Sequence, residues 1–306
     1  MDVEKKTLKV TEDHQNTRLD KVISDYLDDY SRMEIKALLK NGLVLVNGQI
    51  KKPSFLVRGG ETIEISLEEK EEKVLTYQPL NVSILFEDDD LMVVEKPSGL
   101  ITHPSPSTKE PSLLEGLLDR IDPKKFDIPS RAGVVHRLDK DTSGLLLFAK
   151  NEATLTALQA SLQKREVKRY YQAICDGVID HNRGKIDAPI GRHPKKRHMM
   201  SVVAGAKESV TFFNVLERFK ENTLIECELK SGRTHQIRVH MQYIDKPILG
   251  DTTYGRRKQE APHGQFLHAY KLTFTHPQTF ETMAFESELP QFFKAKIETL
   301  RRESNG

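Results

Sequence analysis

Apolar residues near the start of the chain recur at helical spacing in two segments. Residues 19–27 predict one helix, for which Thr17 is the expected N-terminal cap. Ser31 and Glu34 have the spacing of a capping box, which predicts a second helix that ends at Asn41-Gly42. The beginning of the chain is therefore expected to contain two short amphipathic helices.

Strand-like segments follow these helices. Residues 43–46 are continuously apolar and lead into Asn47-Gly48, a pair that favours a tight hairpin turn. A further strand is expected at 61–67. Together with the helices, these strands predict a compact unit over residues 17–67.

The remainder of the chain changes to many short strands separated by turns. One helix is expected at 151–164, and an acidic turn at 87–90 joins the first two strands. Many strands with few helices favour an α+β domain, with a mixed, largely antiparallel sheet and flanking helices. The expected strands lie at 82–86, 91–94, 144–149, 170–175, 210–219, 224–229 and 266–274.

The chain has 306 residues, a comfortable length for two domains. The charged run at 68–73 is typical of a flexible linker. We therefore expect a small α/β module at 1–72, a linker at 73–81 and a larger domain at 82–306.

Composition narrows the class of protein. Hydrophobic residues make up 37% and charged residues 30%, as in globular proteins with a core. The longest apolar run, 145–149, is too short to span a bilayer, and the first residues lack a signal-peptide pattern. We therefore expect a cytoplasmic protein with no membrane partner.

Cys175 and Cys227 lack metal-ligand spacing, so neither zinc nor a disulfide is expected. The net charge of +2 requires any nucleic-acid binder of this composition to gather its basic residues in patches.

A polar cluster at 136–141 runs directly into the apolar strand at 144–149. A continuously apolar strand is typically buried on both faces, which places Asp139 at the edge of a low-dielectric region. Three interpretations remain open from the residues alone. Asp139 is neutral, or a cation elsewhere in the chain keeps it ionised, or it caps the turn before the strand.

Arg238 is the candidate cation, within a segment at 231–241 in which a helix could begin at Thr234. It lies between Ile237 and Val239, and an arginine in such surroundings is rarely buried without an anionic partner. The alternative is a side chain that extends to the surface. Arg233 is five residues earlier and does not share a helical face with Arg238.

These segments match one family together. The motifs HRLDKDTSG at 136–144 and GRTHQIRVHM at 232–241 resemble those of pseudouridine synthases of the RluA/RluD type, which act on large-subunit ribosomal RNA. Four further elements agree, namely RYYQA at 169–173, PIGRHPKKRHMMSV at 189–202, KPILGD at 246–251 and LHA at 267–269. The resemblance covers roughly residues 82–286. Lys230-Ser231 and Ala206 differ from the residues that are common in the family at these positions. Both differences are expected to lie outside the base pocket, so they do not change the residues expected there.

The resemblance implies an isomerase that needs no cofactor and no metal. It implies that Asp139 is the catalytic aspartate, that Arg238 forms an ion pair with it, and that Tyr171 packs against the uracil. Ile237 would form an apolar wall of the base pocket, and Arg137 would enter the RNA stack when the target base leaves it. The expected catalytic residues are Asp139, Arg238 and Tyr171, and the expected substrate contacts in this domain include Arg137, His136, Ile237 and Arg233.

The first module resembles the RNA-binding module of small-subunit ribosomal protein four. The matching elements are TRLDKVI, SRMEIKALLKNGLVLVNG and VRGGETIEI. Basic residues recur every fourth position on its second predicted helix. Taken alone, such a stripe is more often a solvated face. The resemblance implies that Arg18, Arg32, Lys36 and Lys40 face RNA phosphates.

A third basic patch lies at 183–198, where Pro and Gly favour a long loop. We interpret it as an RNA clamp rather than a plain solvated loop, with Arg192, Lys195, Lys196 and Arg197 as contacts. The acidic turn at 87–90 lacks the residue spacing of a calcium-binding loop. The histidines of the basic patch are separated by Lys and Arg residues, whose positive charges would repel a metal ion. Neither is expected to bind a metal.

The expected partner is a structured RNA, bound by a monomer. Large-subunit ribosomal RNA is the first hypothesis for the substrate. The alternatives are transfer RNA as the substrate, or a ribosome-assembly protein that binds RNA and whose catalytic activity is secondary.

Overall fold

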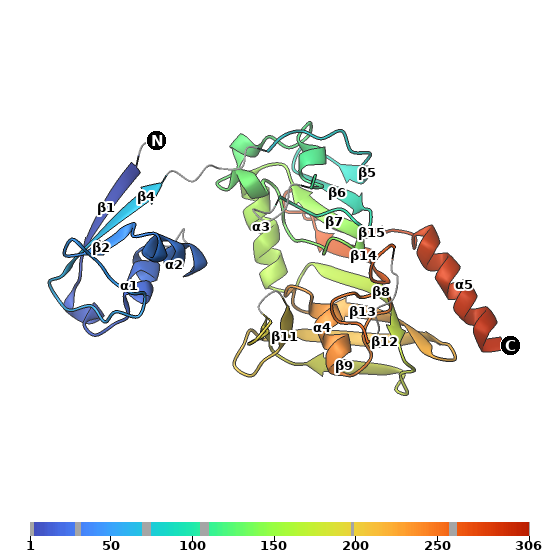
Figure 1. The fold of residues 1–306 in the computed structure, drawn as a ribbon. Helices are drawn as coiled ribbons and strands as arrows, with labels where there is room; N and C mark the ends of the chain where they lie inside the picture. The colour runs from blue at the N-terminus through green and yellow to red at the C-terminus, as the bar shows by residue number, and fades with distance from the viewer. Residues whose placement is uncertain are drawn as a thin grey trace. The chain divides into compact units, whose positions relative to one another are not determined.

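The chain divides into two compact units, residues 1–72 and 73–306 (Figure 1). Each unit has a hydrophobic core of its own. The computed structural model describes residues 3–27, 32–68, 75–104, 110–196, 199–256 and 262–305. The charged run at 68–73 lies outside the described residues apart from its first position.

The first unit is an antiparallel sheet of four strands with two helices. The strand order is β1-β4-β2-β3. The predicted hairpin is present, because Asn47 and Gly48 both have positive φ angles, 49° and 75°, as its tight turn requires. The elements are β1 Val3–Lys9, α1 Leu19–Tyr26, α2 Arg32–Lys40, β2 Val44–Val46, β3 Gln49–Ile50 and β4 Thr62–Glu68.

The predicted N-terminal caps of the two helices have different outcomes. Thr17 as the helix cap is wrong, because Arg18 occupies the cap position of α1 and offers no side-chain cap. The capping box of Ser31 and Glu34 lies outside the described side chains. Strand β1, which pairs with β4 along its whole length, was not expected from the sequence.

The second unit contains one sheet of nine strands, in the order β5-β6-β7-β14-β8-β13-β12-β9, with β15 beside β14. Every pairing is antiparallel except β7 with β14, so the predicted mixed, largely antiparallel sheet is confirmed. Its strands are β5 Ser83–Glu87, β6 Leu91–Lys96, β7 Ser143–Ala149, β8 Lys168–Asp176, β9 Arg183–Asp187, β12 Val210–Arg218, β13 Asn222–Leu229, β14 Leu267–Thr275 and β15 Thr282–Glu286.

Helices α3 Glu152–Gln163, α4 Gln236–Tyr243 and α5 Gln291–Asn305 flank this sheet (Figure 1). The Asn151 side chain caps α3 by accepting a hydrogen bond from the backbone of Thr154. Strand β7 is buried at every position, as its apolar run predicted. Short 3₁₀ helices lie at Glu12–His14, Glu115–Leu117, Pro123–Lys125 and Pro129–Arg131.

The basic segment at 183–198 is not one long loop. It contains β9 and the strand β10 Ile190–Arg192, which pairs with β11 Met200–Val202. Pro189 and Pro194 lie outside these strands, so they do not remove a backbone donor from either strand.

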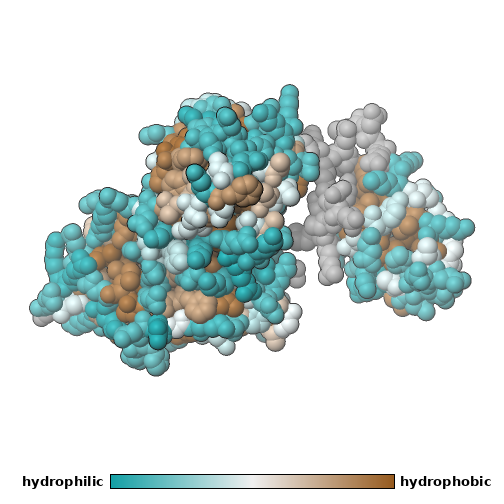
Figure 2. Space-filling view, turned by 180° about the vertical axis from the view of Figure 1, so that it is seen from behind, coloured by the Kyte–Doolittle hydropathy of each residue, from teal (hydrophilic) through white to brown (hydrophobic). Residues whose placement is uncertain are grey.

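The surface in Figure 2 is mainly hydrophilic, and its hydrophobic residues form separate patches. Among the described residues, none of the helices has both the length and the apolar character needed to cross a bilayer.

Candidate active site

A cleft of about 470 Å³ lies in the second unit, between the loop before β7, strands β8 and β13, and α4. It brings together residues from several distant segments of the chain. Seven residues expected from the sequence line it, namely His136, Arg137, Asp139, Tyr171, Arg233, Ile237 and Arg238.

An ion pair connects Asp139 to Arg238 at one side of this cleft. Arg238 Nη1 donates to Asp139 Oδ2 at 2.9 Å, and the side chains are 7% and 18% exposed respectively. The interpretation that Arg238 extends to the surface is therefore wrong. Burial alone would lower the pKa of Arg238, but the hydrogen bonds and charges of Asp251 and Asp139 outweigh it and raise the pKa.

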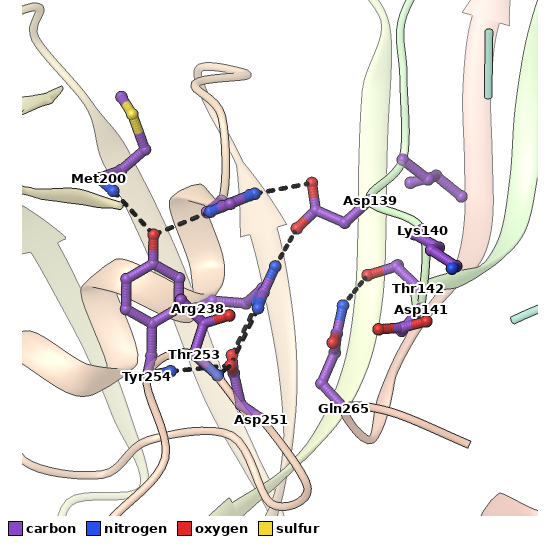
Figure 3. Close-up of polar contacts among 12 residues, drawn as sticks. Asp139, Lys140, Asp141, Thr142, Met200, Arg238, Asp251, Thr253, Tyr254 and Gln265 are labelled. Atoms are coloured by element: carbon purple, nitrogen blue, oxygen red, sulfur yellow. Dashed lines mark hydrogen bonds and ion pairs between the residues drawn. The ribbon is translucent and has the colours of Figure 1, made fainter. Parts of the chain in front are cut away.

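Asp251 holds the opposite edge of the same guanidinium (Figure 3). Its side chain is fully buried and accepts backbone hydrogen bonds from Thr253 and Tyr254 at 2.9 Å each. Burial would raise the pKa of Asp251, but the hydrogen bond and charge of Arg238, with these backbone donors, lower it. Asp251 lies in the KPILGD element that matched the family, but no role was expected for it from the sequence.

A second chain of contacts reaches Asp139 from Tyr254 through His235. Tyr254 Oη accepts a hydrogen bond from the backbone of Met200 at 2.9 Å and lies 2.8 Å from His235 Nδ1. Because the tyrosine oxygen already accepts one hydrogen bond, it can donate its own proton to Nδ1, which leaves the proton of a neutral imidazole on Nε2. That nitrogen is 3.8 Å from Asp139 Oδ1. Burial lowers the pKa of His235, which favours the neutral ring.

Lys96 stabilises the loop that carries Asp139. Its buried ammonium group donates hydrogen bonds of 2.7–2.8 Å to three backbone carbonyls, one of them next to Asp139. Burial lowers the pKa of Lys96 to about 7, although the charges of Asp141 and Asp139 oppose this shift. The carbonyls belong to Pro97, Leu100 and Lys140.

Tyr171 and Ile237 form buried parts of the cleft wall, from β8 and the first turn of α4. Burial raises the pKa of the Tyr171 phenol. Arg137 and Arg233 are exposed at the cleft. His136 accepts a hydrogen bond from a backbone amide of β7 through Nε2, and burial, aided by the charge of Arg169, lowers its pKa to about 3.

Comparison with known proteins identifies the family of this chain. Residues 90–243 match the RNA pseudouridylate synthase family, and residues 17–63 match the S4 domain. An uncharacterized RNA pseudouridine synthase of Bacillus subtilis, YlyB, is 42% identical over 95% of this chain and 97% of its own length. This chain belongs to the RNA pseudouridine synthase family.

Two further relatives place this RNA pseudouridine synthase among named proteins. The ribosomal large subunit pseudouridine synthase D of Neisseria meningitidis serogroup A is 42% identical over 94% of this chain and 79% of its own length. The structure of human RNA pseudouridylate synthase domain containing 4 superposes with a TM-score of 0.57 at 25% identity, covering 72% of this chain and 93% of that chain.

The S4 domain of this synthase carries the four basic residues that were expected from the sequence to face RNA phosphates. Arg18 is exposed and forms an ion pair of 2.8 Å with Asp20. Lys36 and Lys40 are exposed on α2, whereas the Arg32 side chain lies outside the described residues. A shallow hollow of about 440 Å³ is lined by Lys36, Leu39, Lys40, Ile50, Lys51, Lys52 and Pro53.

The basic turn after β10 lies outside the cleft lining. Lys195 and Lys196 are exposed, and their backbone amides both donate to His193 Nδ1 at 3.1 and 3.0 Å. His193 therefore shapes this turn. Arg192 is also exposed, and Arg197 lies outside the described residues.

The acidic turn between β5 and β6 brings Asp88 and Asp90 close to His276, with ligand atoms within 4.8 Å of one another. Each carboxylate already accepts hydrogen bonds. Asp88 accepts from backbone amides and lies 2.9 Å from the His276 ring, and Asp90 accepts from Asn151 and Thr154. These contacts connect the hairpin to α3 and to the turn before β15.

Proposed function

We propose that this enzyme converts specific uridines of large-subunit ribosomal RNA into pseudouridine, with Asp139 as the catalytic carboxylate. The observation that carries the proposal is the ion pair of Asp139 with Arg238 inside the cleft. Relatives named ribosomal large subunit pseudouridine synthase D, which match over 94% of this chain, support the choice of RNA.

The reaction requires a carboxylate with one accessible oxygen. Pseudouridine formation breaks the bond between ribose C1′ and uracil N1, turns the base and joins C1′ to C5, so the product is an isomer. With Oδ2 held by Arg238, Oδ1 of Asp139 accepts no hydrogen bond from any described residue. This oxygen can act as nucleophile or as base toward a nucleotide in the cleft.

The target base must leave the RNA stack to reach Asp139. The cleft volume of about 470 Å³ lies within the range of small-ligand pockets, and Tyr171 and Ile237 provide buried walls for a planar ring. Arg137 is exposed beside Asp139 and is the residue proposed to occupy the vacated place in the stack.

RNA outside the cleft would be held by basic residues of both units. In the first unit we propose phosphate contacts for Arg18, Arg32, Lys36 and Lys40, in agreement with the S4 domain match. In the second unit the turn after β10 would act as an RNA clamp through Arg192, Lys195, Lys196 and Arg197. The enzyme would act as a cytoplasmic monomer.

Mapping pseudouridines in a deletion strain tests the proposal. Loss of sites in large-subunit ribosomal RNA, restored by the wild-type gene but not by Asp139→Asn, is the expected result. Loss confined to transfer RNA would overturn the choice of substrate. Restoration by Asp139→Asn would overturn the catalytic role, and equal RNA affinity of both proteins is the control that the variant is folded.

A further inference from the structure

Arg169 is a buried cation in the wall of the catalytic cleft. It lies on β8 two residues before Tyr171, and therefore on the same face of that strand. The residue is only 9% exposed. Its guanidinium forms no hydrogen bond or ion pair with any residue that the structure describes, and its Nε is fully enclosed without a partner.

Such an arrangement opposes folding. A buried arginine is normally paired with a carboxylate, because removing a charge from water is costly. Burial lowers the pKa of Arg169, which expresses the same cost. Arg238 in the same cleft contacts two carboxylates, whereas Arg169 contacts none. Its acceptor would therefore be supplied by the molecule that enters the cleft.

Gly232 leaves room for this guanidinium. A Cβ atom at position 232 would lie 2.8 Å from Arg169 Nη1, which is too close for an unshifted side chain. The backbone of Gly232 does not have a positive φ, so its lack of a side chain is what matters here. Gly232, Arg169, Tyr171 and Asp139 all line the cleft in which we place the uracil.

We propose that Arg169 donates hydrogen bonds to the carbonyl oxygens of the extruded uracil and stabilises the negative charge that the ring gains during the reaction. This inference rests on the proposed function. When the N1–C1′ bond breaks, its electron pair stays with uracil and spreads onto O2 and O4. When C5 joins C1′, the ring loses the C5 proton and N1 takes up a proton. A cation already fixed beside the carbonyl oxygens lowers the barrier to the first step.

Single-turnover rates at saturating RNA test this role. The RNA is a synthetic stem-loop that carries the uridine mapped in the deletion strain. Arg169→Met should slow pseudouridine formation about 100-fold or more with little change in RNA affinity, and Arg169→Lys should recover part of the rate. Lys168→Gln, on the exposed side of the same strand, is the control and should keep the wild-type rate.

Thermal unfolding separates this role from a structural one. Removing an unpartnered buried charge should leave the melting temperature of Arg169→Met equal to or above that of the wild type. A merely structural arginine would instead give a lower melting temperature. A wild-type rate in Arg169→Met, or a melting temperature that falls while the remaining folded enzyme keeps its rate, would overturn the proposal.

Substituted RNAs identify the contact. Sulfur is a weak acceptor, so 2-thiouridine or 4-thiouridine at the target should slow the wild type more than Arg169→Met. Equal slowing of both enzymes by both substitutions would overturn the carbonyl contact. A methylphosphonate beside the target uridine removes a phosphate charge. If it slows the wild type but not Arg169→Met, Arg169 contacts that phosphate, and the carbonyl contact is overturned. If the wild type forms no pseudouridine in the unsubstituted stem-loop, the proposed function fails, and this role fails with it.

Discussion

Asp251 fixes Arg238 through two parallel hydrogen bonds, from Nε to Oδ2 at 2.7 Å and from Nη2 to Oδ1 at 2.9 Å. This bidentate geometry orients the guanidinium so that Nη1 donates to Asp139 Oδ2 at 2.9 Å. The backbone amides of Thr253 and Tyr254 hold Asp251 in turn. The position of the proposed catalytic carboxylate is therefore determined by a turn that does not itself line the cleft.

We expect Asp251→Asn to reduce both stability and activity. An amide removes the charge that compensates Arg238 and presents donors to a donor, which costs about 3 kcal/mol of unfolding free energy for a buried pair. Denaturant unfolding measures this loss. Single-turnover assays of the folded protein should show a rate about 100-fold lower, because the guanidinium no longer orients Asp139.

Asp245→Asn is the matched control, because Asp245 is highly exposed and pairs with Arg256 at the surface. It should change unfolding free energy by less than about 1 kcal/mol and leave the rate unchanged. A wild-type rate in Asp251→Asn would show that Arg238 does not need Asp251 for its orientation.

The sequence predicted the sheet and the two halves of the site because both signals are local. Continuous apolar residues predicted the buried strand β7, and the HRLD and GRTHQIR segments identified Asp139 and Arg238. The residues alone named Arg238 as one candidate partner of Asp139, and the family resemblance implied that the two meet across 99 positions. Periodicity reports which face of an element is buried, but not which distant element covers it.

Other features show where local signals were absent or unused. In the sequence, nothing distinguishes the charges of Asp251 and Arg169 from those of surface residues. The fold shows that Asp251 is paired with Arg238, whereas Arg169 Nε is buried without a partner. Helix α5 had a usable signal, since Phe293, Ile297 and Leu300 recur at helical spacing and are buried. Strand β1 is rich in lysine, and its pairing with β4 is a tertiary property that no local pattern encodes.

Neutralising the turn after β10 should weaken RNA binding and its dependence on salt. Lys195→Ala, Lys196→Ala and Arg197→Ala combined would remove up to three phosphate contacts. The slope of log affinity against log salt should then fall by about 2. Lys220→Ala, at an exposed site between β12 and β13, is the control. An unchanged slope in the triple variant would show that this turn does not contact phosphates.

His268 should make stability fall in mild acid. Its ring is buried between Ser143 and Ser287, and burial lowers its pKa to about 4 from an ordinary value near 6.5. Between these values the unfolded chain binds a proton that the folded protein does not, so unfolding free energy decreases as pH falls. The contribution reaches about 3 kcal/mol below pH 4.

Denaturant unfolding of His268→Gln from pH 7 to pH 4 measures this contribution. The variant should gain stability relative to the wild type as pH falls through this range. His181→Gln, which changes an exposed histidine, should follow the wild-type profile. Parallel curves for His268→Gln and the wild type would contradict the assignment.

Deleting residues 1–72 should leave a folded synthase unit with poorer RNA selection. The two hydrophobic cores share no residue, so the second core stays complete without the S4 domain. Calorimetry should show one cooperative transition for residues 73–306, and single-turnover activity on a short stem-loop should persist at higher RNA concentration. The affinity for long ribosomal RNA should fall, because the basic residues of the first unit are gone. A fragment that is unfolded would place the domain boundary elsewhere, and undiminished affinity for long RNA would remove the proposed phosphate contacts of the S4 domain.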